Sequence, residues 1–156
     1  FLPGYYEEGG LLIKQARELG IMQPILGPDG FANSTLVELA GADNVDNVFY
    51  ASHFTPNSED PKVQEFLAAF EAEYGKPADS FAALAYDAAQ LVFDAITTAD
   101  STDPQAITDA LAATEDFEGV TGTFSFDENH NPIKSAFVIE LQDGVEVGNS
   151  VVEPAK

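Results

Sequence analysis

Gly4-Tyr5-Tyr6-Glu7-Glu8-Gly9-Gly10 opens the stretch that decides the fold, and Gln23-Pro24-Ile25-Leu26-Gly27-Pro28-Asp29-Gly30 ends it. The residues predict, in order, the end of a strand, a loop of tyrosines and carboxylates, a helix, a turn, a strand and a second acidic loop. Aromatic and acidic side chains therefore recur where strands end. In an open α/β sheet, the carboxyl ends of the strands form the edge where ligands bind.

Outward from this stretch, the sequence predicts further helices and strands in alternation. Apolar periodicity indicates helices over 7–19, 35–39, 61–74, 80–96 and 104–111, with strands at 25–26 and 48–51. Proline follows a capping aspartate at Asp60-Pro61 and at Asp103-Pro104, which is typical of a helix start. Gly20 and Gly75 suit helix ends. Thr35 and Glu38 are spaced as a capping box.

Near the C-terminus the periodicity changes from helical to alternating. Residues 121–126 predict a strand, 127–132 a turn, and 136–141 a second strand that pairs with the first, followed by a turn at Asp143-Gly144. The predicted fold is α/β in three layers, with a largely parallel sheet, helices on both faces and a C-terminal β-hairpin.

The composition is that of a globular and strongly acidic chain. Of its 156 residues 45% are hydrophobic, and 27 Asp and Glu against 6 Lys and Arg give a formal net charge of −21. Such a surface repels nucleic acid and anionic lipid, so neither is expected as a partner. The acids are spread along every segment, which favours a solvated surface suited to a salty milieu over a field that attracts cations.

The chain has no cysteine, so it has no disulfide, no thiol nucleophile and no cysteine-based zinc site. Phe1-Leu2-Pro3 is interpreted as the tail of a strand, which makes the chain a fragment of a longer protein. On that interpretation a signal peptide or a lipid-attachment cysteine would lie upstream.

The opening stretch, Tyr86-Asp87-Ala88 and Gly122-Thr123-Phe124-Ser125-Phe126-Asp127 together resemble a known family. It is that of the branched-chain amino-acid-binding proteins of the Leu/Ile/Val type, which have the type I periplasmic-binding-protein fold. The resemblance spans nearly the whole chain and matches the C-terminal half of such proteins, its specificity lying in the order and spacing of the stretches. It implies two lobes, with residues 1–32 and 115–156 in the second lobe and 33–114 returning to the first.

The tyrosines and glutamates of the first loop have the chemistry that a free amino acid needs. An ammonium group is bound by carboxylates and by aromatic faces. The resemblance implies that Glu8 holds the ligand's amino group. The alternative is that Glu7 and Glu8 only occupy the first turn of a helix, where the helix dipole favours acids; it is preferred for Glu7 and stays open for Glu8. Tyr5 is expected in the pocket, and for Tyr6 both roles stay open.

The second and third loops supply the remaining candidates. The resemblance implies that an acid of the Gly27-Pro28-Asp29-Gly30 loop lies near the ligand's amine, whereas the alternative for Asp29 is an ordinary turn. Phe31 is expected to pack under the loop. Phe54 stands where the family often has an aromatic residue, so it is a further candidate for the ligand site.

Other motifs indicate neither a metal site nor catalysis. His53 and His130 lack metal-ligand spacing, and a surface or capping role is preferred for both. Asp127, Asn129 and Asn131 begin like a calcium loop, but Pro132 replaces the required glycine, so a hairpin turn is preferred. No nucleophile elbow, Walker loop or dinucleotide glycine pattern is present, and neither an enzyme nor a cofactor is predicted.

The expected function is that of an extracytoplasmic solute-binding protein of an ABC importer. It would bind a branched-chain or other small amino acid between two lobes and present it to a membrane permease, in the periplasm or lipid-anchored at the cell surface. The alternative is the ligand-sensing domain of a receptor or regulator, which shares this architecture.

Overall fold

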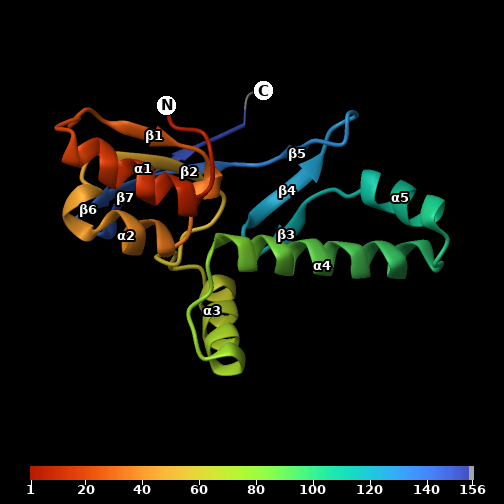
Figure 1. The fold of residues 1–156 in the computed structure, drawn as a ribbon. Helices are drawn as coiled ribbons and strands as arrows, with labels where there is room; N and C mark the ends of the chain where they lie inside the picture. Colours follow the sequence, from red (N-terminus) through yellow and green to blue (C-terminus); the bar gives the residue numbers. More distant parts are fainter. Residues whose placement is uncertain (155–156) are drawn as a thin grey trace. The chain divides into compact units, whose positions relative to one another are not determined.

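The structure is a computed structural model that describes residues 1–154, apart from the side chain of Asn149 (Figure 1). The predicted helices and the first two strands are confirmed, with small shifts at their ends. In chain order the elements are α1 Tyr6–Glu18, β1 Ile25–Gly27, η1 Asp29–Phe31, α2 Thr35–Ala40, η2 Ala42–Asn44, β2 Val48–Ser52, α3 Pro61–Tyr74, α4 Ser80–Ala99, α5 Pro104–Ala112, β3 Phe117–Gly119, β4 Gly122–Phe126, β5 Pro132–Ile133, β6 Ala136–Gln142 and β7 Val145–Val152.

The chain forms two compact units. Unit 1 contains residues 1–55, 79–81 and 136–152, and unit 2 contains residues 56–78 and 82–135 with Glu153 and Pro154. These bounds differ from the expected lobe ranges, because residues 33–55 lie in unit 1 and residues 115–135 lie in unit 2. The assignment of either unit to a lobe of a longer protein stays a prediction.

Unit 1 is built on a four-stranded sheet in the order β1-β2-β6-β7. β1 and β2 are parallel, with Leu26 opposite Phe49, whereas β2 pairs with β6, and β6 with β7, in antiparallel fashion. The α/β class is confirmed, but the sheet is mixed rather than largely parallel. The reason is that a crossover connects only β1 to β2, while residues 136–152 enter the sheet as a hairpin.

The core of unit 1 joins this sheet to α1 and α2, which lie beside each other in Figure 1. The helices can approach closely because α1 carries glycines at the contact: a Cβ on Gly10 would lie 2.8 Å from the Leu36 carbonyl oxygen. Phe31 is fully buried, as expected of a ring that packs under its loop. The buried residues of the cluster are Ile13, Phe31, Ala32, Leu36, Ala40, Val45, Val48, Tyr50, Ile139 and Leu141.

Unit 2 combines α3, α4 and α5 with an antiparallel sheet in the order β3-β4-β5. The expected pairing of 121–126 with 136–141 is therefore wrong. β4 pairs with β3 and β5, and the C-terminal hairpin is β6 with β7. Asp143 and Gly144, with φ of 51° and 80°, form the two-residue connection of this hairpin. Positive φ at both positions is what the favoured hairpin turn requires.

Capping side chains determine where α3 and α5 begin. Asp60 accepts a hydrogen bond from the Lys62 amide at 2.8 Å, and Asp103 caps α5 through the amides of Gln105 and Ala106, so both predicted caps are confirmed. The predicted capping box of α2 is wrong, because the Thr35 amide donates to Asn33 Oδ1 instead. None of the helices among the described residues is long and apolar enough to span a membrane.

Candidate functional site

The candidate site is the edge of the unit 1 sheet where β1 and β2 end. Because β1 and β2 are parallel, the loops that follow Gly27 and Ser52 leave the sheet at the same edge. The first residues of the chain run beside β1, since the Leu2 amide donates to the Leu26 carbonyl at 2.9 Å. Three loops therefore gather here, 4–6, 28–31 and 52–55.

The first two of these loops are in contact. A Cβ on Gly30 would lie 2.6 Å from the Gly4 carbonyl oxygen and 3.1 Å from Tyr5 Cδ1, so only glycine permits this approach. Tyr5 directly precedes α1, and its side chain is 63% exposed. The structure thus brings the loop of Tyr5 and the loop of Asp29 together, although they lie far apart in the sequence.

Tyr6 forms an aromatic pair that the sequence did not reveal. Its ring, partly buried against the core, lies 6.1 Å from the ring of Phe81 in an edge-to-face arrangement. Phe81 belongs to the first turn of α4, which is part of unit 1, and it stays 38% exposed. Sequence reasoning missed Phe81 because it falls within a helix whose central turns are almost entirely apolar, where one more aromatic residue gives no distinct signal.

The two acidic candidates are both exposed. Glu8 lies in the first turn of α1 beside Glu7, and Asp29 begins the short helix η1 after β1. These positions agree with the helix-dipole interpretation of Glu8 and with the turn interpretation of Asp29. They also leave both carboxylates accessible to a ligand. Their joint binding of an ammonium group stays a prediction.

The third loop is fixed by hydroxyl and amide groups. Ser52 Oγ donates to the Phe54 carbonyl at 2.7 Å and accepts from the Phe54 amide at 3.2 Å. Asn33 Nδ2 donates to Asp79 Oδ2 at 2.6 Å, and Ser80 Oγ lies 3.5 Å from Ser52 Oγ. Phe54 is only 4% exposed, so its side chain is buried within the protein.

A buried tyrosine connects β2 to β7 in the same unit. The Tyr50 hydroxyl donates to Glu146 Oε1 at 2.8 Å, and Thr55 Oγ1 donates to Glu146 Oε2 at 3.3 Å. Burial, together with the negative charge of Glu146, raises the pKa of Tyr50 far above its usual value, which keeps the hydroxyl protonated as a donor. The contact fixes the end of β2, from which the third loop departs.

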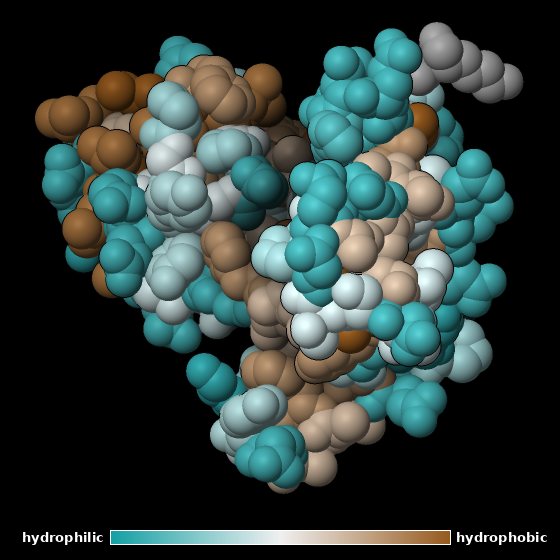
Figure 2. Space-filling view, turned by 90° about the vertical axis from the view of Figure 1, so that its right-hand side faces the viewer, coloured by the Kyte–Doolittle hydropathy of each residue, from teal (hydrophilic) through white to brown (hydrophobic). Residues whose placement is uncertain are grey.

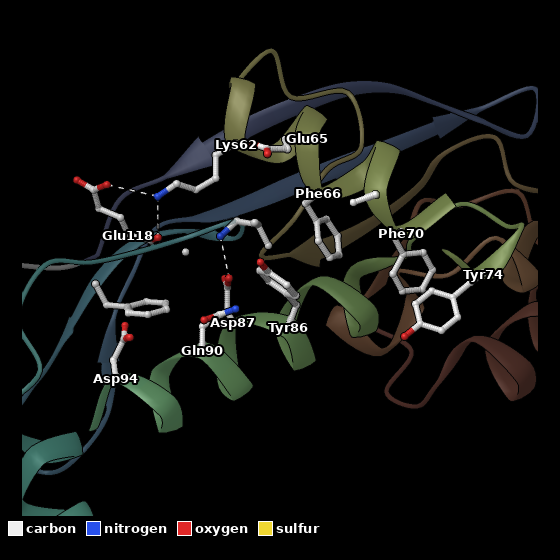
Figure 3. A pocket seen from close by; sticks show the side chains of 14 residues that line it. Lys62, Glu65, Phe66, Phe70, Tyr74, Tyr86, Asp87, Gln90, Asp94 and Glu118 are labelled. Atoms are coloured by element: carbon white, nitrogen blue, oxygen red, sulfur yellow. Dashed lines mark hydrogen bonds and ion pairs between the residues drawn. The ribbon is translucent and has the colours of Figure 1, made fainter. Parts of the chain in front are cut away.

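A separate cavity of about 590 Å³ lies within unit 2 (Figure 3). The rings of Phe66, Phe70, Tyr74 and Tyr86 lie together on one side, and Lys62 pairs with Glu118 on the other. None of the five predicted site residues lines this cavity, and the ring of Tyr86 packs against that of Phe66.

The Asp87 carboxylate, at the wall of that cavity, accepts three hydrogen bonds from the protein itself. It is buried, and it accepts from the amides of Val120 and Thr121, both at 2.8 Å, and from Thr121 Oγ1 at 2.6 Å. Lys134 donates to the same hydroxyl, and burial lowers the pKa of Lys134. This cluster holds α4 to the connection between β3 and β4.

The sequence was compared with protein families and with known proteins. A family model described as "Periplasmic binding protein" matches residues 7–146, and the chain belongs to this family. A curated relative from Pseudomonas aeruginosa, described as a leucine-, isoleucine-, valine-, threonine- and alanine-binding protein, is 33% identical over 128 residues, which are 82% of this chain and 34% of the relative.

Solved structures show the same fold. The branched-chain amino acid transporter substrate-binding protein LivJ of Streptococcus pneumoniae, in complex with isoleucine, is 41% identical with a TM-score of 0.88. The leucine-binding protein LivK of Thermotoga maritima is 33% identical with a TM-score of 0.87. In both cases 97% of this chain is covered, but only 43% of the longer chain. The fold is therefore that of the type I periplasmic binding proteins, in part of its length.

Proposed function

We propose that this chain is part of an extracytoplasmic solute-binding protein of an ABC importer, and that the protein binds branched-chain or other small amino acids. The observation that carries the proposal is the edge of the unit 1 sheet, where aromatic and acidic loops gather in a chain of this family. LivJ, which is similar over 97% of this chain, is described as holding isoleucine, and a Desulfitobacterium hafniense relative as holding leucine.

In this proposal the carboxylates of Glu8 and Asp29 neutralise the ammonium group of the amino acid. Tyr5 lines the pocket with its exposed ring, and Tyr6 with its neighbour Phe81 adds aromatic surface. Phe54, which is buried, helps to hold the third loop through the hydrogen bonds of its backbone to Ser52 Oγ. The carboxylate of the ligand is bound by hydroxyl and amide groups outside these 156 residues. The role of the site is binding without turnover.

We further propose that the two units belong to different lobes of the full-length protein. Residues 1–55 and 136–152 would belong to one lobe and most of 56–135 to the other, in place of the ranges 1–32 with 115–156 and 33–114. The support is that the chain crosses between the compact units more than once, as expected of a protein whose lobes are linked by several segments.

The partner that follows from this role is a membrane permease, which receives the ligand-bound form. The location is extracytoplasmic, either free in the periplasm or lipid-anchored. A sensing domain of a receptor would bind the same ligand and differ only in the attached segments. The relatives described as transporter components favour import.

Calorimetry with isoleucine on the full-length protein tests the site. We expect Glu8→Gln and Asp29→Asn each to weaken binding at least tenfold, which corresponds to about 1.4 kcal/mol. Glu7→Gln is the matched control, since it removes a neighbouring exposed carboxylate from the same helix turn, and it should change the affinity less than about twofold. Unchanged affinity in either test variant would remove that residue from the proposed site.

A further inference from the structure

Between α3 and the body of α4 the chain returns to unit 1 for only three residues. Residues 79–81 belong to unit 1, whereas the residues before and after them, 56–78 and 82–135, belong to unit 2. The last of the three is Phe81, whose ring lies 6.1 Å from that of Tyr6 in the first loop of the candidate site. Because the segment is so short, the position of Phe81 depends on what holds residues 79 and 80.

Asp79 is held by the side chain of Asn33. Asn33 Nδ2 donates to Asp79 Oδ2 at 2.6 Å, and Oδ1 of the same asparagine accepts from the Thr35 amide at 2.8 Å. Since both ends of the side-chain amide are bonded, its donor is directed at Asp79. The backbone amide of Asn33 donates to the Phe31 carbonyl at 2.7 Å. Residue 79 is therefore attached to the second loop of the site, 28–31.

Ser80 is attached to the third loop. It is only 6% exposed, and its Oγ lies 3.5 Å from Ser52 Oγ, which in turn bonds the backbone of Phe54. Asp79 thus connects to the second loop, Ser80 to the third and Phe81 to the first. Three successive residues each contact a different loop of the candidate site.

Exposure alone does not distinguish Phe81. Figure 2 shows hydrophobic residues, in brown, between hydrophilic residues on one side of the molecule. Leu19 is 80% and Phe93 61% exposed, against 38% for Phe81. What distinguishes Phe81 is that both residues before it are anchored and that its ring pairs with Tyr6. A ring fixed in advance presents its apolar surface to a ligand at a low cost in conformational entropy.

We propose that Asn33 and Asp79 are positioning residues of the amino-acid site, which hold Phe81 where it contacts the apolar side chain of the ligand. The inference rests on the proposed function, because it takes the ligand to be an amino acid. Its consequence is selectivity. The contact with Phe81 strengthens binding of isoleucine, whose side chain is large and apolar, and adds little for alanine, whose side chain is a methyl group.

Exchanging donor and acceptor in the full-length protein tests the pair. Asn33→Asp keeps an oxygen for the Thr35 amide but places a second carboxylate against that of Asp79, so repulsion replaces the hydrogen bond. Adding Asp79→Asn to this variant restores a donor and an acceptor in reversed order, and it returns the net charge to its original value. Asp79→Ala removes the acceptor without repulsion, which keeps the test decisive if Asn33→Asp does not fold.

Two measurements are needed. Calorimetry gives the affinities for isoleucine and for alanine, and their ratio cancels any effect of the altered charge on the ammonium group that both ligands share. Nuclear Overhauser effects between the rings of Tyr6 and Phe81, recorded without ligand, report whether the ring contact is kept.

We expect Asn33→Asp and Asp79→Ala to lower the ratio of isoleucine affinity to alanine affinity about fivefold or more, and to remove the ring contact. The double variant should regain the contact and the ratio to within about twofold. An unchanged ratio, a ring contact that persists in the single variants, or a double variant as impaired as Asn33→Asp would overturn the proposal. Absence of isoleucine binding in the unaltered protein would instead contradict the proposed function, while the ring contact would still decide whether Asn33 and Asp79 position Phe81.

Discussion

At the scale of single residues, Arg17 shows how this acidic chain uses one of its six cationic side chains. The guanidinium is buried and donates to four backbone carbonyls, those of Ile21 at 2.7 Å, Asp46 at 2.9 Å, Gln23 at 3.0 Å and Asn44 at 3.2 Å. It therefore joins the end of α1 to two loops of unit 1. The forked geometry is specific to arginine, because a lysine ammonium is a single point of donation.

Arg17→Lys is expected to destabilise the chain by about 2–4 kcal/mol, since hydrogen bonds from a charged donor contribute about 1.5–3 kcal/mol each and lysine keeps only some of them. Urea denaturation followed by circular dichroism measures the change. Lys14→Met on the exposed side of α1 is the control and should leave the midpoint nearly unchanged. An equal midpoint for Arg17→Lys and the unaltered chain would show that the four contacts are not important for stability.

Tyr50 makes the free energy of unfolding depend on pH in the alkaline range. Its pKa is raised in the folded state by burial and by Glu146, so the folded state retains the proton that the unfolded chain loses above about pH 10. The stabilisation that the buried, protonated Tyr50 hydroxyl gives to the folded state is present below about pH 10, and it declines as the pH rises further. We expect the free energy of unfolding to fall above pH 10, and to fall less steeply in Tyr50→Phe. Identical pH profiles for the two proteins would contradict this assignment.

At the scale of elements, the Asp87 carboxylate is the contact that joins α4 to the β3–β4 connection. An asparagine in its place would keep the shape but offer one acceptor oxygen to three donors, and leaving a buried donor unpaired costs about 1–3 kcal/mol. We expect Asp87→Asn to destabilise the protein by that amount and to speed amide hydrogen exchange at Val120 and Thr121. Asp94→Asn, an exposed change on the same helix, should leave both amides unaffected. Unaltered exchange in Asp87→Asn would refute the role of the carboxylate.

The sequence predicted elements far better than their pairing. Helix starts at Asp60 and Asp103 depend on neighbouring residues, so a local pattern was enough. The pairing of β6 with β2 joins residues far apart in the chain, and nothing local specifies it. The Asp143-Gly144 turn was predicted. A two-residue turn of this kind also indicates a hairpin, so the strand at 145–152 could have been predicted from it but was not.

The candidate site was likewise predicted only where local sequence patterns point to it. Tyr5 and Asp29 were predicted as site residues from loop chemistry and from a family resemblance, and the fold brings their loops into contact. Phe81 was missed because its position next to Tyr6 follows from the return of the chain to unit 1 at residues 79–81, which no periodicity reveals.

At the scale of the whole molecule, the net charge of −21 controls the response to salt. Lys62 pairs with Glu118, but the chain has only 6 Lys and Arg for its 27 Asp and Glu, so most acids have no cation to pair with and repel one another. Raising NaCl from about 0.01 M to about 1 M shortens the screening length from about 30 Å to about 3 Å. We expect the urea midpoint to rise clearly over this range. A midpoint that is constant or falls with salt would mean that charge repulsion does not limit stability.

The account as a whole depends on the edge of the unit 1 sheet being one wall of an amino-acid site. A crystal structure of the full-length protein grown with isoleucine measures this directly. It should show the ligand's ammonium nitrogen within about 3 Å of a carboxylate oxygen of Glu8 or Asp29, with Tyr5 against the ligand. Isoleucine bound elsewhere, with both carboxylates facing solvent, would contradict the account.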